Sequence, residues 1–313
     1  MKMYFNILFF FIIVYCPLDG IVLAESDNGS KISQWMQKHN ISIRKTFDGS
    51  KNESKPAAIQ WVNNANSNEE DHYLVDIAVK LMEWDLLKNS QSIFTVYPVA
   101  EWHRNTKESK PVNNASGSLK LEFYPLPLRG YSHDGKPIPP TYNEQRLFTI
   151  SPFLLGSVEF ERDFYENQNE LKASLSASLA SNKRWLPGSD FRKRNGAFIG
   201  RYYPYLGYEY YEPISSEQKK HASFGVARLY IEYWPVSGIE NQYLQMTLDW
   251  IYRYSLHSES IESDKIDLLT ASISFYLDGR GNIAIGYEYL RGEDPKSGFS
   301  FREQSTIGLR IKF

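Results

Sequence analysis

Charged side chains occur at every second position along much of the chain, and together they could form one polar surface. A period of two places alternate residues on opposite faces of a strand, so the charged residues share one face and the apolar residues the other. Acids and bases nearly balance on the charged face. Such a face suits a narrow, weakly selective passage for hydrophilic solutes, and equally an interior closed by ion pairs. The candidate residues are Asp76, Lys80, Glu101, His103, Lys120, Glu122, Glu159, Glu161, Arg201, Glu209, Arg228, Glu232, Asp249, Arg253, Glu288 and Arg310.

Residues suited to catalysis are few. His103 lies close to Glu101, and His257 lies between Ser255 and Ser258, which are residue types that a lipid hydrolase uses. No nucleophile elbow, metal-binding histidine pair or phosphate-binding loop accompanies them. The sequence therefore favours a non-enzymatic role, with no catalytic residue, no metal site and no cofactor.

Strands must carry the charged face, and the alternation predicts about twelve of them. Polar or turn-forming stretches separate one alternating segment from the next. The expected strands cover residues 57–63, 73–81, 92–103, 119–123, 147–161, 171–179, 198–211, 227–233, 244–253, 269–277, 282–289 and 304–313.

The first residues predict a cleaved secretory signal peptide over residues 1–24. Lys2 supplies a positive start, residues 7–16 an apolar core, and residues 22–24 a cleavage site of small residues. The apolar run is shorter than the roughly 20 residues that a membrane-spanning helix needs. The only cysteine, Cys16, lies within this segment, so we expect no disulfide in the mature chain.

The last ten residues alternate without a break and end on an aromatic residue. Their apolar face consists of Ile307, Leu309, Ile311 and Phe313. This ending resembles the C-terminal assembly signal of Gram-negative outer-membrane β-barrel proteins. The signal peptide and the alternating body fit the same class, and no particular family within it is recognised.

The resemblance implies an all-β fold, a closed antiparallel transmembrane barrel over residues 56–313, in which an even strand number is expected. We expect residues 25–55 to form a short periplasmic segment packed under the barrel, and favour this over a small plug. Residues 278–281 suit a tight periplasmic turn and residues 291–303 an extracellular loop. Residues 125–145 and 182–196 would be unusually long periplasmic connections. Expected partners are outer-membrane lipids, lipopolysaccharide and, through the C-terminal strand, the barrel-assembly machinery.

The composition agrees with a barrel and argues against a nucleic-acid partner. Aromatic residues make up 15% of the chain, with 22 Tyr and 7 Trp, which suits interfacial girdles. The formal net charge of −2 leaves no basic footprint for nucleic acid. A large soluble β-sheet protein is the structural alternative, but its polar faces would collect charges at random rather than balanced pairs.

These features predict an outer-membrane barrel that acts as a passive channel for small hydrophilic solutes with a mixed-charge lumen. Two alternatives stay open. One is a lipid-modifying enzyme with a Ser and His pair at the lipid-facing rim. The other is a sealed structural or adhesive barrel that acts through its extracellular loops.

Overall fold

The structure is a computed structural model of the 313-residue chain. It describes residues 36, 41–50, 53, 55–62, 72–88, 92–106, 112–125, 150–165, 167–181, 186–188, 191–192, 199–214, 221–235, 243–258, 265–277, 282–294 and 300–311. The expected signal peptide and the last two residues, Lys312 and Phe313, lie outside this part of the chain. Residues 40–313 form one compact unit.

Within the described residues the chain forms fifteen strands. Three are short: β1 (Ser42–Arg44), β4 (Trp84–Lys88) and β9 (Phe191–Arg192). The others are β2 (Ala57–Val62), β3 (His72–Lys80), β5 (Ile93–Asn105), β6 (Val112–Tyr124), β7 (Ile150–Asp163), β8 (Gln168–Ser181), β10 (Ile199–Pro213), β11 (Ala222–Trp234), β12 (Leu244–Ser258), β13 (Lys265–Tyr276), β14 (Ile283–Asp294) and β15 (Ser300–Ile311). No described helix is long and apolar enough to cross a membrane.

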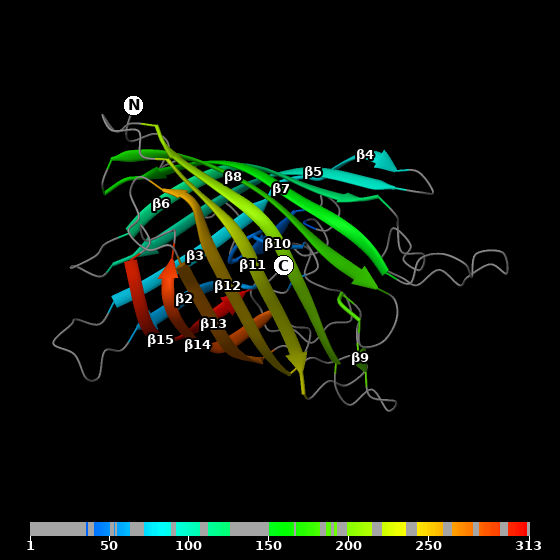
Figure 1. The fold of residues 1–313 in the computed structure, drawn as a ribbon. Helices are drawn as coiled ribbons and strands as arrows, with labels where there is room; N and C mark the ends of the chain where they lie inside the picture. The colour runs from blue at the N-terminus through cyan, green and yellow to red at the C-terminus, as the bar shows by residue number, and fades with distance from the viewer. Residues whose placement is uncertain are drawn as a thin grey trace. The chain divides into compact units, whose positions relative to one another are not determined.

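Twelve of the described strands pair in a closed antiparallel ring. Neighbours around the ring follow the order β2, β3, β5, β6, β7, β8, β10, β11, β12, β13, β14 and β15. The ring closes where β15 pairs with β2, with Leu309 opposite Ile59 and Arg310 opposite Ala58. Figure 1 shows these two strands, from opposite ends of the chain, side by side. Closure leaves no free sheet edge, so each ring strand finds hydrogen-bond partners on both sides.

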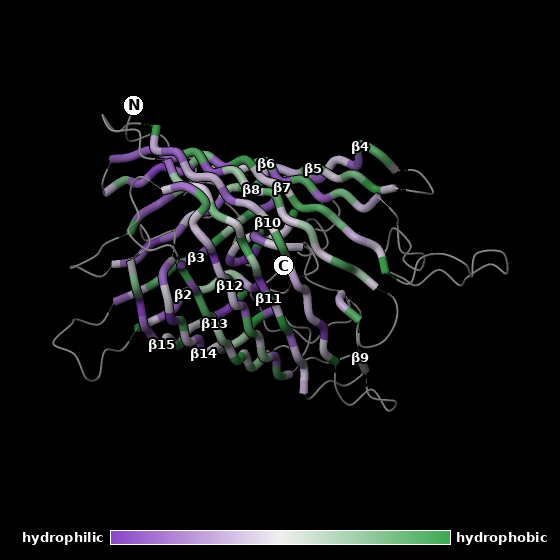
Figure 2. Tube along the Cα trace, viewed as in Figure 1, coloured by the Kyte–Doolittle hydropathy of each residue, from purple (hydrophilic) through white to green (hydrophobic). Residues whose placement is uncertain are grey.

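The two faces of the ring differ as the alternation predicts. On β15, Thr306 and Arg310 are 3% and 4% exposed, whereas Ile307 and Leu309 are 52% and 41% exposed. Figure 2 shows hydrophilic and hydrophobic positions following one another along the strands. The apolar side chains therefore cover the outside of the barrel and the polar side chains fill its interior, which is the arrangement of a membrane-spanning barrel.

The predicted all-β fold and strand number are confirmed, and each expected strand has its counterpart in the ring. The short strands add to this ring: β1 pairs with β3, β4 with β5, and β9 with β10. Leu277 N donates to Ile283 O at 2.8 Å across the predicted tight turn, whose residues 278–281 lie outside the described chain. Most of the two long connections, residues 125–145 and 182–196, also lies outside it.

Candidate functional site in the barrel lumen

The residues predicted for the charged face all point into the barrel. Five of them are half-buried, namely Asp76, Glu159, Arg201, Glu209 and Asp249, and the others are buried. Buried charges require partners, because desolvation of an isolated ion costs several kcal/mol. The lumen is accordingly organised as a series of ion pairs, and these pairs define its geometry.

Part of the chain before β2 enters the lumen. We name the described residues 45–50, 53 and 55 the lumen segment. Lys45 N donates to Lys55 O at 2.8 Å and Glu53 N donates to Ser50 O at 2.9 Å, so the segment leaves and rejoins the wall at one place. Gly49 provides the reversal with a φ of +96°, a conformation that residues with a Cβ rarely adopt.

For the described residues 45–50, 53 and 55, this placement differs from the expected position under the barrel; most of the rest of the expected periplasmic segment over residues 25–55 lies outside the described part of the chain. The side chains of the lumen segment contact inward side chains of β3, β5, β6, β10, β11, β12 and β14, as the pairs below show. A segment can reach so many strands only from inside the ring. The small plug, which was the less favoured alternative, therefore describes the lumen segment better, because its charges find partners in the lumen rather than beneath it.

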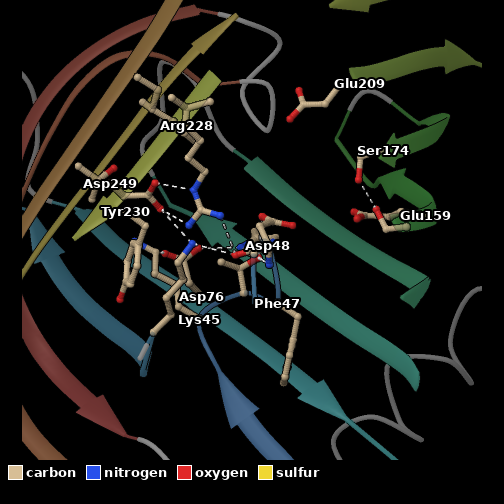
Figure 3. Close-up of a pocket in the computed structure, with 18 of the residues that line it drawn as sticks. Lys45, Phe47, Asp48, Asp76, Glu159, Ser174, Glu209, Arg228, Tyr230 and Asp249 are labelled. Atoms are coloured by element: carbon tan, nitrogen blue, oxygen red, sulfur yellow. Dashed lines mark hydrogen bonds and ion pairs between the residues drawn. The ribbon is translucent and has the colours of Figure 1, made fainter. Parts of the chain in front are cut away.

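One ion-pair cluster centres on Arg228 of β11. Its guanidinium lies 2.7 Å from Asp249 of β12 and 2.6 Å from Glu53 of the lumen segment. Lys55 Nζ contacts Asp249 at 3.0 Å, and Tyr205 OH donates to Glu53. Figure 3 shows Arg228 and Asp249 facing one another across this cluster. The cluster anchors the lumen segment to three neighbouring strands of the wall.

A second cluster holds the start of the lumen segment against the opposite wall. Lys45 Nζ lies 2.6 Å from Glu288 and 3.5 Å from Asp76. Burial lowers the pKa of the Lys45 ammonium, but the carboxylates of Glu288 and Asp76 outweigh it and raise that pKa above its ordinary value. Lys45 is therefore charged at neutral pH. Glu288 also accepts from Arg310 at 3.1 Å.

His103 belongs to a third cluster. Its ring nitrogens lie 2.8 Å from Asp76 and 3.2 Å from Glu101. Lys120 in turn lies 3.4 Å from Glu101 and 3.0 Å from Asp48 of the lumen segment. His103 is thus part of the lumen's charge network rather than of the lipid-facing surface that the enzymatic alternative requires.

The other histidine considered for catalysis has a different setting. His257 of β12 is exposed and stacks on His221, with the ring centroids 4.8 Å apart. Within the described residues, no group of three or more His, Cys, Asp or Glu side chains could hold a metal ion.

The remaining predicted residues pair within the wall. Lys80 contacts Glu83 at 2.5 Å, and Arg201 lies 3.0 Å from the buried Glu232. Three other pairs join one strand to another, two of them between neighbouring strands and the third from β10 to β12. These pairs are Glu122 with Tyr97 at 3.1 Å, Glu161 with Lys172 at 2.6 Å and Glu209 with Arg253 at 2.7 Å.

Aromatic side chains gather toward one end of the lumen. Phe153, Tyr203, Tyr205 and Tyr230 form a buried cluster with Leu155 at the barrel end where β15 finishes. Tyr124 stacks on Phe153 with ring centroids 5.1 Å apart. We call this cluster the aromatic floor. The sequence gives no sign of this inward role, because a high tyrosine content equally suits the interfacial girdles of a barrel.

A cavity of about 330 Å³ with charged side chains in its lining occupies the lumen beside the lumen segment. Its lining runs from Tyr205 and Tyr230 of the aromatic floor to Asn105 and Gln304 near the other barrel end. Ten of the predicted charged-face residues line it, namely Asp76, His103, Lys120, Glu159, Glu209, Arg228, Asp249, Arg253, Glu288 and Arg310. The cavity is large enough to hold a small polar molecule, with charges of both signs within reach.

No protein-family model matches the chain, and no curated protein matches it. Solved structures do. The transport unit of the autotransporter AIDA-I from Escherichia coli aligns with a TM-score of 0.39 at 10% identity, over 87% of this chain and 90% of that one. The β domain of the Bordetella autotransporter BrkA aligns with a TM-score of 0.36 at 10% identity, over 87% of this chain and 98% of that one. The outer membrane channel DcaP of Acinetobacter baumannii aligns with a TM-score of 0.32 at 11% identity, over 85% of this chain and 78% of that one. The chain is a closed antiparallel barrel with an apolar exterior, and that assignment rests on its own strand register and on the exposure of its side chains.

Proposed function

We propose that the protein is a channel for small hydrophilic solutes in the outer membrane of a Gram-negative bacterium, with the lumen segment restricting passage. The observation that carries this proposal is the cavity of about 330 Å³ inside the ring, whose lining includes charged side chains of both signs. A sealed barrel would fill its interior with side chains in contact, as small barrels do. Here the interior keeps space for a solute.

The lumen segment and the aromatic floor together restrict the path. The floor narrows one end of the lumen with buried aromatic side chains, and the ion pairs of Glu53 and Asp48 hold the segment against the inner wall. A solute that enters the cavity therefore has to displace the segment to cross. Since the wall carries both signs of charge, we expect weak overall ion selectivity and small, intermittent conductance steps.

Single-channel recording in planar bilayers tests the proposal. A second chain should be recorded in which residues 46–54 are replaced by two glycines. This shortening is feasible because Lys45 and Lys55 are hydrogen-bonded neighbours at 2.8 Å. We expect small steps from the native chain and larger, longer steps from the shortened chain.

The outcomes separate the candidate functions. Heat-modifiable gel mobility first shows that each chain is a folded barrel. If neither folded chain gives conductance steps, the channel function is contradicted and a sealed barrel is favoured. Equal conductance from both chains would keep the channel but remove the role of the lumen segment.

A further inference from the structure

One inward carboxylate differs from all the others. Glu159 of β7 lines the cavity, yet it is the only inward carboxylate of the described strands and lumen segment that makes no hydrogen bond or ion pair with another described residue. Figure 3 shows it across the cavity from Arg228 and Asp249. A half-buried carboxylate without a partner is costly to keep charged, so a cationic partner that arrives from outside would be bound there with a gain in free energy.

The lysines near Glu159 are already paired with other acids. Lys120 contacts Asp48 at 3.0 Å and Glu101 at 3.4 Å. Lys172 contacts Glu161 at 2.6 Å and Glu170 at 3.3 Å. With Glu159 included, five carboxylates surround two lysines, so this side of the cavity carries a surplus of negative charge although the lumen as a whole is balanced.

Hydroxyl groups surround the same carboxylate. Ser118 lies directly opposite Glu159 in the β6–β7 register, is only 8% exposed, and its Oγ has no described hydrogen-bond partner. Ser157 and Ser174 line the cavity beside Glu159 with their Oγ atoms 2.7 Å apart. Gly207 and Ser176, also in the lining, add no bulk. This wall therefore offers one negative charge, several hydroxyls and room for a ligand.

We propose that Glu159 anchors the cationic amino group of a small hydrophilic solute, with the hydroxyls of Ser118, Ser157 and Ser174 around it. The proposal rests on the channel function above, since it names the class of solute that the cavity favours. An ammonium group suits the site because it donates up to three hydrogen bonds, which one carboxylate and neighbouring hydroxyls can accept. A divalent metal ion suits it less, because such ions prefer several charged oxygen ligands.

Calorimetric titration of the refolded chain in a zwitterionic detergent at low salt tests the site without any need for conduction. The probes are 1,4-diaminobutane, glutarate as an anion of similar length, and magnesium chloride. We expect saturable binding of the diamine alone. Glu159→Gln should weaken it at least tenfold, because the amide keeps the shape but removes the charge. The diamine affinity of Glu159→Asp should fall between those of the native chain and Glu159→Gln. Aspartate keeps the negative charge, but its shorter side chain holds the carboxylate farther from the ligand.

The matched control is Glu303→Gln. Glu303 of β15 is exposed outside the barrel and accepts from Tyr289 OH at 2.8 Å, so its loss should leave diamine affinity unchanged. Equal affinities for the native chain and Glu159→Gln would overturn the proposal, as would preference for glutarate or magnesium, or no saturable binding by the native chain. If the chain binds the diamine through Glu159 but never conducts, the binding site would be supported and the channel function would be contradicted.

Discussion

At the scale of single residues, the stability of the lumen depends on charges that are buried together. Arg228 shows this best, because it is buried and joins Asp249 of the wall to Glu53 of the lumen segment. If the guanidinium is removed, Lys55 remains as the cation in contact with both carboxylates. One cation then faces two buried carboxylates, so one negative charge is left desolvated and uncompensated.

Arg228→Met should therefore lower the free energy of unfolding by about 3–5 kcal/mol, the usual cost of breaking a buried pair. Urea unfolding followed by tryptophan fluorescence measures it. Lys265→Met is the control, because Lys265 is exposed at the end of β13 and its charge stays solvated. Adding Glu53→Gln to Arg228→Met should recover part of the loss. If Arg228→Met and Lys265→Met unfold at the same urea concentration, the buried cluster contributes no stability.

Gly49 is the residue on which the reversal of the lumen segment depends. Its φ is +96°, and a Cβ built there would collide with the side chains of Glu53 and Arg228. Gly49→Ala should lower the free energy of unfolding by about 1–3 kcal/mol through backbone strain, with a further loss from displaced ion pairs.

Thermal unfolding compares the melting temperature of Gly49→Ala with that of a control glycine variant. The control is Gly117→Ala in β6, where a Cβ would meet nothing within 4 Å and the φ is not in the left-handed region. Its melting temperature should stay near that of the native chain. A similar fall in both variants would mean that Gly49 is no more constrained than a strand glycine.

At the scale of elements, the sequence predicts strands well and the lumen segment poorly, for a physical reason. Each ring strand lies between lipid and lumen, so its residues must alternate, and the alternation is visible without a structure. The lumen segment contacts polar groups on every side and needs no period. Its partners are also remote, since Lys45 pairs with Glu288, 243 positions away. Balanced charge in the lumen is visible in sequence, but the pairing of those charges is not.

The apolar outer face of β15 leads to a prediction about depth in the membrane. Leu309 is 41% exposed on this face, and Ser305 lies on the same face four residues nearer the strand's other end, beside the charged Glu303. Arginine on the lipid face costs about 2–4 kcal/mol at the bilayer midplane and about 0–1 near the interface.

Leu309→Arg should accordingly destabilise the barrel in lipid vesicles by more than Ser305→Arg, by about 1–3 kcal/mol. Reversible guanidinium unfolding in vesicles measures the difference. The same two variants in detergent should differ less, because micelles adapt to the charge. An equal effect of both variants in vesicles would mean that the two positions lie at similar depth, which would contradict the prediction.

At the scale of the whole molecule, the barrel exists only if the two ends of the sequence meet. The closing pair of β2 and β15 brings Ile59 opposite Leu309, and Val75 of β3 lies opposite Ile59 on its other side. Opposite residues in antiparallel strands have Cα atoms about 4.5–5.5 Å apart. Residues two strands apart lie about 9–10 Å from each other, beyond the 7 Å limit for a disulfide.

Cysteines at Ile59 and Leu309 should therefore form a disulfide in the folded chain, while cysteines at Val75 and Leu309 should not. Since Cys16 is the only native cysteine, replacing it with serine leaves no competing thiol. Gel mobility of the oxidised, denatured chain before and after reduction reads out the bond, which closes a loop of most of the chain. Because both pairs share Leu309, a difference between them depends on register alone. Bridging of the Val75 pair in preference to the Ile59 pair would show that the barrel closes through other strands.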